Sequence, residues 1–331
     1  MATPALRALR EHCPDSRITY LLRQYVRPVI DGAPWHDRLM VVRSRKVRTP
    51  TVTGAKPVRR RRGLVARLRR RRFDTAVLLP NSFRSALLVS SAGIPRRIGY
   101  DRDGRGLLLT DRLLPMRRKG HYVPVSAVDY YLGLARYLGG AGVDRRLQLF
   151  TRPEDDARAQ AILRGAGVNG DQRPLVVLNP GAATKGKSKL WPADRFAAVA
   201  DHLVERYQAI VAVSGAPNER PILDSVHRAA KCRILDLPSL GCDLALLKSV
   251  LRRCSLLVTN DTGARHIAVG VGAPVISLFG PTDPRWTVLD YDREQILQGS
   301  EGRMESIEVL TVLEAAQRLL GVTQLPQPIP D

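Results

Sequence analysis

The strongest constraint on the fold is a repeated strand–turn–helix order between residues 175 and 282. In its clearest copy, the apolar run 254–259 has the composition of a buried parallel strand, and the polar turn 260–263 follows it. A helix is predicted over 264–271 and the next strand over 273–278. Earlier in this half, the same criteria predict strands at 175–178, 209–213 and 234–237 and helices at 192–206, 221–230 and 244–253. Such alternation predicts an α/β fold with a parallel, doubly wound sheet.

The polar turn after the strand 254–259 has the residue types of a binding site. In open α/β sheets, ligands bind beyond the carboxyl ends of the strands, beside helix N-termini. This turn places Asp261, Thr262 and Gly263 there, with His266 one helical turn later. Gly263 permits close approach of a ligand, and the free N–H groups of a helix start favour a phosphate. The alternative is purely structural: Asp261 or Thr262 caps the helix, and His266 is a buried side chain.

Together with Phe279-Gly280-Pro281-Thr282, this segment resembles the donor-binding signature of glycosyltransferase family 9, the ADP-heptose:lipopolysaccharide heptosyltransferases. Four further segments resemble the same family and follow its order along the chain: 1–9, 79–86, 93–100, and 179–182 with 189–192. The segments 79–86 and 93–100 are most similar to the heptosyltransferases II of this family. The resemblance implies a GT-B fold, in which two doubly wound, Rossmann-like domains face a cleft.

The resemblance also implies a set of donor-binding residues in the second half of the chain. By this likeness, Lys189 contacts the donor phosphate, Thr184 lies near the place where the family has a hydroxyl contact to the donor, and Glu219 accepts hydrogen bonds from the ribose hydroxyls. Asp261, Thr262, Gly263 and His266 match the contacts to the diphosphate and the sugar, and His266 is expected to assist departure of the nucleotide. The alternatives are an exposed basic loop at 184–189 and a solvated Glu219. Arg265 either adds charge at the diphosphate or faces solvent, and the sequence does not decide between the two.

Candidate acceptor contacts lie in the first half. Ser82 and Arg84 follow a predicted strand at 74–79 and are expected at its carboxyl end. Arg96 and Arg97 are candidates for binding anionic groups of an acceptor. The alternative for all of these residues is an ordinary surface position, because this half of the chain is rich in arginine.

Length and charge predict two domains of different character. The chain has 331 residues, enough for two domains of about 150 residues. We expect an N-terminal acceptor-binding domain at 1–150 and a C-terminal nucleotide-sugar-binding domain at 151–331. The first half is expected to contain strands at 15–21, 38–43 and 74–79, helices at 63–72, 85–92 and 129–138, and a loop at 101–122. A last helix at 309–320 is expected to cross back onto the first domain.

The whole net charge of +22 comes from the first half. Residues 1–150 contain 32 Lys and Arg against 10 Asp and Glu, whereas residues 151–331 contain 21 of each. This asymmetry predicts an anionic partner for the first half. Nucleic acid is the least expected partner, because few aromatic side chains are present to stack on bases. The family resemblance favours an anionic lipid A–Kdo–heptose acceptor at a membrane surface.

Composition also sets expectations for location and cofactors. No apolar run reaches the roughly 20 residues of a membrane-spanning helix, and no export signal opens the chain. The four cysteines lack metal-ligand spacing, so we expect reduced structural thiols, no metal and no cofactor. The predicted protein is cytoplasmic, peripheral on the inner face of the inner membrane, and monomeric.

One family feature does not match the printed sequence. In the family, a Gly-Asp turn that carries the proposed general base precedes the helix equivalent to residues 3–9. Here that motif would lie upstream of Met1, so the first domain is expected to lack its N-terminal strand. Either the true start lies upstream, or the protein is a remnant that binds donor but transfers poorly. Asp101 and Asp103 lie in a loop that is the only other suggestion for a base.

The function expected from the resemblance is that of an inverting heptosyltransferase. It would transfer a heptose from ADP-heptose to the lipopolysaccharide inner core by a single displacement without a metal, with ADP-heptose as substrate rather than cofactor. Two alternatives stay open. One is a family-9 transferase with another donor sugar, and the other is a donor-binding protein without an effective general base.

Overall fold

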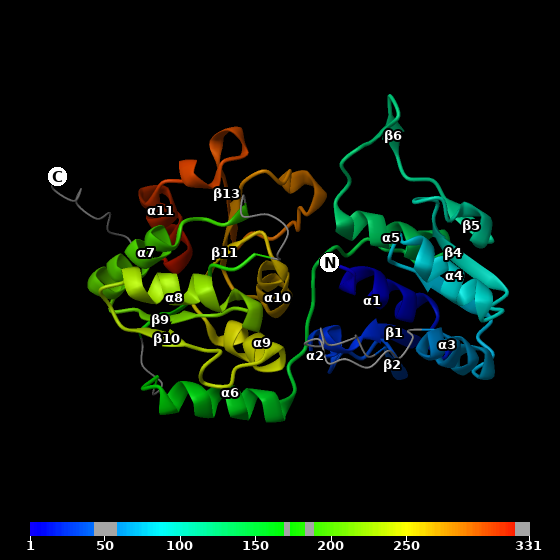
Figure 1. Cartoon of the computed structure of the whole chain (residues 1–331), viewed down its shortest axis with the longest axis horizontal. Coiled ribbons are helices and arrows are strands. Elements are labelled where there is room, and N and C mark those ends of the chain that lie inside the picture. Colours follow the sequence, from blue (N-terminus) through cyan, green and yellow to red (C-terminus); the bar gives the residue numbers. More distant parts are fainter. Residues whose placement is uncertain (43–57, 169–172, 183–188, 322–331) are drawn as a thin grey trace. The chain divides into compact units, whose positions relative to one another are not determined.

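Two compact units make up the computed structural model, which describes residues 1–42, 58–168, 173–182 and 189–321. Unit 1 consists of Met1–Thr19, Val42–Arg145 and Arg285–Val288, and Unit 2 of Tyr20–Val41, Arg146–Pro284 and Leu289–Asp331. Both units are therefore discontinuous along the chain (Figure 1). Helices and strands alternate in both, so the expected α/β class with parallel sheets is confirmed.

Unit 2 is built on a six-stranded sheet in which neighbouring strands are parallel. Its strand order is β10-β9-β8-β11-β12-β13. The strands are β8 (Leu175–Asn179), β9 (Ile210–Val213), β10 (Ile234–Asp236), β11 (Leu256–Asn260), β12 (Val275–Phe279) and β13 (Glu294–Gln298). The chain runs outward from β8 to β10, then returns to β11 on the other side of β8. This reversal makes the β8–β11 boundary the topological switch point of a doubly wound sheet.

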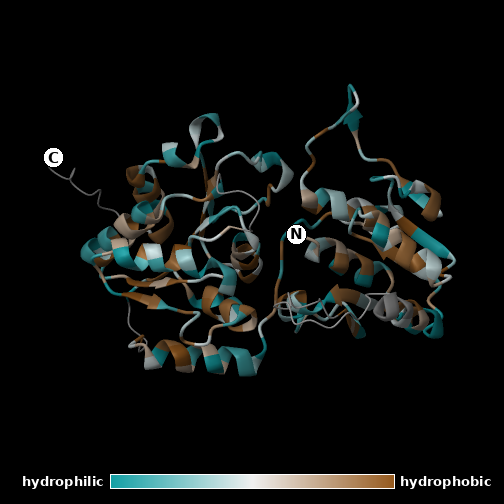
Figure 2. Ribbon diagram, viewed as in Figure 1, coloured by the Kyte–Doolittle hydropathy of each residue, from teal (hydrophilic) through white to brown (hydrophobic). Residues whose placement is uncertain are grey.

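Helices enclose the sheet of Unit 2. They are α6 (Pro153–Gly165), α7 (Ala193–Tyr207), α8 (Arg220–Ala229), α9 (Leu244–Arg253), α10 (Gly263–Val271) and α11 (Val309–Leu320), with the short η4 (Pro217–Glu219) before α8. Every residue of β8, β11 and β12 is buried, as expected when helices cover both sheet faces. Figure 2 shows that the strands are hydrophobic and that the helices around them carry hydrophilic residues. Each large apolar side chain of this core, such as Phe196 or Leu203, stabilises the fold by about 1.5–3 kcal/mol.

The last helix differs from the sequence-based expectation. α11 occupies the residues predicted for it, but it packs within Unit 2 instead of crossing onto the first domain. Val312, Leu313, Ala315 and Ala316 are buried in the same core cluster as the strands of the sheet. A helix with this apolar stripe is equally suited to either location, so periodicity alone does not choose its partner.

Unit 1 contains a three-stranded parallel sheet with the order β3-β4-β5. Its strands are β3 (Thr75–Leu78), β4 (Arg96–Tyr100) and β5 (Asp111–Leu113), and its helices are α1 (Thr3–His12), α3 (Val58–Arg70), α4 (Phe83–Ser91) and α5 (Ala127–Tyr137). The helices α1 and α5 pack on each other.

A separate two-stranded sheet belongs almost entirely to Unit 2. It joins β1 (Thr19–Arg23) to β2 (Arg38–Val42), with η1 (Gln24–Val26) and α2 (Arg27–Ile30) between them.

The segment 101–122, predicted as a loop, is more ordered than its composition indicates. It contains η2 (Gly106–Leu108), β5 and an antiparallel hairpin of β6 (Arg117–Arg118) and β7 (His121–Tyr122). Lys119 and Gly120 between these strands both have positive φ, at 50° and 80°. Positive φ at both central residues is the signature of a type I′ turn, which matches the twist of a two-residue hairpin. Sequence reasoning missed it because lysine is uncommon at this position.

A buried lysine joins α2 to α9 within Unit 2. Lys248 on α9 is 1% exposed, and its Nζ donates to the carbonyl oxygens of Pro28 at 2.9 Å and Asp31 at 3.0 Å. The ammonium group thereby satisfies carbonyls at the end of a four-residue helix, which has few hydrogen bonds of its own. Burial lowers the pKa of Lys248.

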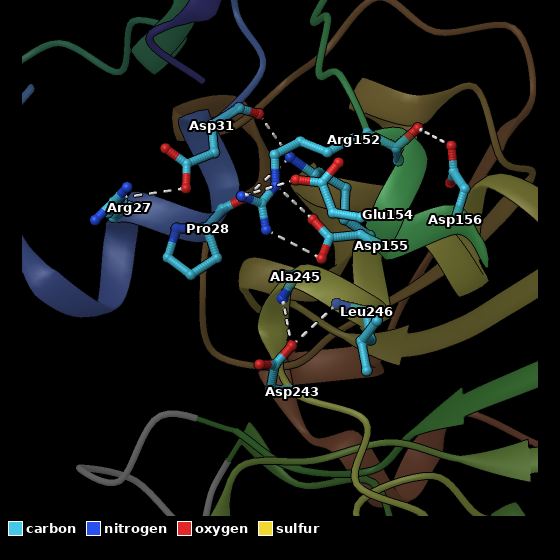
Figure 3. Close-up of polar contacts among 12 residues, drawn as sticks. Arg27, Pro28, Asp31, Arg152, Glu154, Asp155, Asp156, Asp243, Ala245 and Leu246 are labelled. Carbon is cyan, nitrogen blue, oxygen red and sulfur yellow. Dashed lines mark hydrogen bonds and ion pairs between the residues drawn. The ribbon is translucent and has the colours of Figure 1, made fainter. Parts of the chain in front are cut away.

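Charged residues surround this junction (Figure 3). The Arg152 guanidinium binds Asp155 at 2.8 Å and Glu154 at 3.2 Å, both within the first turn of α6. The Asp243 carboxylate caps α9 by accepting from two backbone N–H groups. Among the described helices, none is long and apolar enough to cross a membrane.

We predict that Lys248→Met lowers the free energy of unfolding by about 2–3 kcal/mol, because the carbonyls of Pro28 and Asp31 lose the ammonium group that donates to them. Urea unfolding followed by circular dichroism measures the change. Lys231→Met, at an exposed position, is the matched control and is expected to change stability by less than about 0.5 kcal/mol. Equal stability of the two variants would contradict the structural role of Lys248.

Candidate functional site

The candidate site lies at the carboxyl ends of β8 and β11, the two strands that flank the switch point of Unit 2. These strands pair in parallel with Thr259 opposite Asn179. The loops that leave their ends therefore start side by side, at the place where ligands bind in open α/β sheets. One of them begins with residues 180–182, and the other is the turn that contains Asp261 and Thr262.

Two buried asparagines fix the paths of these loops. Asn260 donates from Nδ2 to the carbonyl oxygens of Pro180 at 2.8 Å and Gly181 at 3.2 Å, and its Oδ1 accepts from the Trp191 N–H. Asn179 donates to the backbone and side-chain oxygens of Ser214, both at 3.0 Å. Each side chain thus ties its own strand to a neighbouring loop. Because both are buried, loss of either amide would leave polar groups without partners.

Asp261 lies just beyond the end of β11, between two cations. Its Oδ2 is 3.9 Å from Lys189 Nζ, and its Oδ1 is 3.8 Å from Arg265 Nη1. Burial raises the pKa of Asp261, and the two cations oppose that rise. The structure therefore brings Lys189 and Asp261, which are 72 positions apart in the sequence, into one charged group.

Thr262 and Gly263 form the start of α10. Thr262 is its N-cap, with Oγ1 accepting from the Ala264 N–H at 3.3 Å and donating to Asn179 Oδ1 at 3.3 Å. The structural alternative for Thr262 is thus observed, and the hydroxyl also joins the asparagine network. Gly263 is exposed, and a Cβ at this position would meet nothing within 4 Å. Space for a ligand consequently lies directly beside the free N–H groups of the helix.

His266 lies on the first turn of α10. Its Nδ1 atom is buried and has no hydrogen-bond partner within the described residues. Burial, with a further contribution from Arg265, lowers the pKa of His266 well below its ordinary value. The imidazole is therefore neutral near pH 7 and is able to donate one hydrogen bond without carrying a positive charge.

Glu219 is held against the loop that follows β8. Its Oε2 accepts from the Ala216 N–H at 2.7 Å. The carboxylate lies so close to Gly181 that a Cβ there would be 2.2 Å from Glu219 Cδ. Gly181 is thus required by close approach of this side chain. Thr184, the remaining predicted donor residue, lies outside the described residues.

Arg265 does not face solvent, and its guanidinium group is bound by a carboxylate of Unit 2. It is fully buried, and its Nε and Nη2 bind Glu294 Oε1 at 2.6 Å and Oε2 at 3.0 Å. Glu294, on β13, is 4% exposed and also accepts from Ser277 Oγ at 2.5 Å. The Arg265 guanidinium lies 5.0 Å from the ring centroid of Phe279. Sequence reasoning missed Glu294, because its partner is 29 positions away and its strand was not predicted.

Ser82 and Arg84, the first pair of predicted acceptor contacts, lie at the carboxyl end of β3 in Unit 1. Ser82 is the N-cap of α4, and its Oγ accepts from the Ser85 N–H at 3.3 Å. Arg84 is exposed in the first turn of the same helix. The structure therefore brings these two side chains together at a helix start.

Arg105, which sequence reasoning missed, organises this loop. It is fully buried and donates to the carbonyl oxygens of Pro80 and Tyr100 and to Asn81 Oδ1. The Tyr130 hydroxyl donates to the same Asn81 oxygen at 2.9 Å. Gly99 is needed for the passage of this arginine, because a Cβ there would lie 2.9 Å from Arg105 Nη2. The only sequence signal was an arginine among many others in a predicted loop.

Arg96 and Arg97 lie at the opposite end of the sheet from Ser82 and Arg84. Arg96 starts β4 and pairs in register with Thr75, the first residue of β3. Its guanidinium binds Asp111 Oδ1 at 3.0 Å, and Arg97 donates to the carbonyl oxygens of Ile94 and Leu108. The structure does not bring the two arginine pairs together, and it engages the second pair in contacts within Unit 1.

The remaining residues with possible catalytic or metal-binding roles are Asp101, Asp103 and the cysteines. Asp101 packs against Gly106, where an added Cβ would lie 2.4 Å from its Oδ2, and Asp103 is exposed with a φ of 54°. Within the ranges that the structure describes, no group of three or more His, Cys, Asp or Glu side chains is placed to hold a metal ion. The four cysteines are free thiols.

Comparisons with known proteins identify the family of the chain. The family model for glycosyltransferase family 9 (heptosyltransferase) matches residues 61–316. Among curated proteins, the chain is 29% identical to lipopolysaccharide heptosyltransferase 2 of Escherichia coli K12 over 298 residues, which cover 87% of this chain and 80% of that protein. It is also 29% identical to lipooligosaccharide heptosyltransferase 2 of Haemophilus influenzae, over 71% of this chain and 68% of that protein.

Solved structures give the same result for the fold. A family 9 glycosyl transferase from Veillonella parvula matches with a TM-score of 0.82 at 23% identity, covering 97% of this chain and 93% of that one. The E. coli ADP-heptose lipopolysaccharide heptosyltransferase II matches with a TM-score of 0.77 at 24% identity, covering 96% and 94%. The predicted GT-B type, with Rossmann-like domains, is thereby confirmed.

The chain belongs to glycosyltransferase family 9, as the family match over most of its length shows. It is an enzyme, a transferase, and the resemblance stated from its sequence motifs is confirmed.

We predict that Arg265→Met alone lowers the free energy of unfolding by about 3–5 kcal/mol, because the Glu294 carboxylate is left buried without its cation. The double variant Arg265→Met/Glu294→Gln removes both charges, keeps an acceptor for Ser277, and should lie within about 2 kcal/mol of the parent. Urea unfolding of the parent, both single variants and the double variant measures the coupling.

Arg228→Met, at an exposed arginine of α8, serves as the control for loss of a surface charge. If the double variant is as unstable as the sum of the single variants, the two residues do not act as a pair, and this account of the site fails.

Proposed function

We propose that the protein is an inverting heptosyltransferase that transfers a heptose from ADP-heptose to the lipopolysaccharide inner core, in the manner of a heptosyltransferase II. The observation that carries this proposal is the charged group at the switch point of Unit 2, in which Lys189 Nζ lies 3.9 Å from Asp261 Oδ2 beside the open start of α10. Family membership supports the transfer chemistry, and the names of the relatives support the sugar and the acceptor.

Different residues of Unit 2 are suited to bind different chemical groups of the donor. Lys189 and the N–H groups at the start of α10 offer positive charge and hydrogen bonds to the diphosphate. Glu219 is a hydrogen-bond acceptor suited to the ribose hydroxyls, and Asp261 to hydroxyls of the sugar. The neutral His266 donates a hydrogen bond to a phosphate oxygen as negative charge builds on the departing nucleotide. Thr184 remains a predicted hydroxyl contact to the donor.

The proposed reaction is a single displacement without a metal. An acceptor hydroxyl attacks the anomeric carbon from the face opposite the diphosphate and releases its proton to water, the bond to the diphosphate oxygen breaks, and the configuration inverts. Ser82 and Arg84 are the proposed acceptor contacts, because they lie exposed at one helix start. Arg96 and Arg97 stay as weaker candidates because their guanidinium groups are engaged. The acceptor is an anionic glycolipid, so we place the enzyme peripherally on the inner face of the inner membrane, as a monomer.

The test is transfer by the native protein purified from its own cells, with ADP-heptose and a heptosylated inner-core acceptor. Product mass and the anomeric configuration by NMR report transfer and inversion, and chelator is expected to leave the rate unchanged. A parallel panel of ADP-, UDP- and GDP-sugars identifies a different donor. Donor binding with no transfer from any of these donors would sink the proposal and favour the binding-only alternative.

We predict that Gly181→Ala raises the donor KM about 10- to 100-fold, because the new Cβ displaces the Glu219 carboxylate. Glu219→Gln is expected to raise the KM by a similar factor. Steady-state kinetics with varied donor measure both effects.

Gly165→Ala is the matched control, since a Cβ there meets nothing within 4 Å, and it should keep the parental KM. A parental KM in Gly181→Ala would contradict the assignment of Glu219 to the donor, without bearing on the identity of the sugar.

A further inference from the structure

A basic hairpin with exposed apolar residues extends from Unit 1. It comprises β6, the Lys119-Gly120 turn and β7, together with the flanking residues 112–116 and 123–125 (Figure 1). We call these residues, 112–125, the basic hairpin. Its sequence contains four Lys and Arg residues and no Asp or Glu.

The apolar residues of the basic hairpin are exposed instead of packed. Leu114 is 79% exposed and Met116 is 65% exposed. The Val123 N–H donates to the Met116 carbonyl oxygen at 3.0 Å, so the pairing of the hairpin continues through these residues. Figure 2 shows a hydrophilic tip, with hydrophobic residues on the connecting segments below it. Exposed side chains of this size, next to a cluster of cations, mark an interaction surface.

The hairpin is an ordered element with a fixed tip. The type I′ turn sets its register, and Tyr122 binds it to the rest of Unit 1. The guanidinium carbons of Arg117 and Arg102 lie 4.4 Å and 3.9 Å from the Tyr122 ring centroid, and Arg117 Nη2 donates to the Tyr122 hydroxyl at 2.6 Å. Arg118 and Lys119 remain exposed at the tip. A preformed element loses less conformational entropy on binding than a flexible loop.

We propose that the basic hairpin is the element that binds the protein to an anionic lipid bilayer. Arg118 and Lys119 bind lipid phosphates and Arg117 adds its charge at the same tip, while Leu114 and Met116 enter the boundary between headgroups and acyl chains. An element that binds at a bilayer surface requires cations next to apolar side chains. The cations are attracted to the anionic lipid headgroups, and the apolar side chains are buried among the acyl chains. The positive excess of residues 1–150 adds a long-range attraction to the same surface. This inference rests on the proposed function only in that a lipid-anchored acceptor brings the enzyme to a bilayer.

The experiment is co-sedimentation of the full chain with vesicles of phosphatidylglycerol and phosphatidylcholine, with phosphatidylcholine vesicles alone for comparison. The variant Arg117→Gln/Arg118→Gln/Lys119→Gln is expected to weaken binding to anionic vesicles about 100-fold, at about 1 kcal/mol for each basic residue. The matched control Arg67→Gln/Arg70→Gln/Arg71→Gln removes three exposed charges from α3 and its end, and should weaken binding less than about fivefold, since its charges lie elsewhere on Unit 1.

A second pair of variants tests the apolar contribution. Leu114→Ser/Met116→Ser should abolish the part of the binding that persists at high salt, whereas Leu240→Ser/Leu310→Ser, at exposed leucines of Unit 2, should not. Brominated lipids should quench a tryptophan introduced as Met116→Trp. Equal loss in both charge variants would show diffuse attraction and overturn the assignment to the hairpin.

Two further outcomes count against the inference. If the hairpin variants bind vesicles like the parent but change the sedimentation coefficient, the surface joins two copies of the chain. If they lose affinity for DNA and keep affinity for lipid, the partner is nucleic acid. No donor sugar is present in these measurements, so their failure and the failure of the proposed transfer reaction are distinguishable.

Discussion

The hydrogen bonds of Asn179 and Asn260 are the interactions on which the candidate site depends. They lie at the ends of adjacent parallel strands, where the chain reverses its direction of winding and two loops separate. A loop at a switch point has no ladder partner, so its backbone carbonyls need another donor. Asn260 supplies that donor to Pro180 and Gly181, and Asn179 anchors the Thr262 cap. The positions of Lys189, Asp261 and Glu219 follow from these fixed loops.

Buried cations perform a second structural task in both units. Arg105 holds the loop that carries Ser82, Lys248 closes the end of α2, and Arg265 pairs with Glu294 beneath the Asp261 turn. A buried cation is costly unless its hydrogen bonds are satisfied, so each of these side chains fixes several backbone or carboxylate oxygens at once. In a chain with 53 lysines and arginines, this use of charge is separate from the exposed cations of the basic hairpin.

Much of the fold follows from local patterns. The apolar runs at β8 and β11 and the periodic helices between strands predicted the doubly wound sheet of Unit 2, because buried parallel strands have a near-continuous hydrophobic composition. The strand β13 and the basic hairpin were not predicted, since β13 is a half-exposed edge strand and the hairpin depends on positive φ at a lysine. The predicted packing partner of α11 was wrong, because an apolar stripe on a helix does not determine which surface the helix packs against.

For the site, the sequence by itself determined which residue types stand beside a strand end and a helix start: Asp261, Thr262, Gly263 and the glycine at 181. It also determined the charge asymmetry between the two halves, which is a property of composition. Only the tertiary structure decided that Arg265 forms a buried ion pair with Glu294 and that Arg96 lies at the opposite end of its sheet from Ser82. The physical reason is that ion pairing and burial depend on distance in space, and the sequence order of a doubly wound fold separates strands that the sheet makes neighbours.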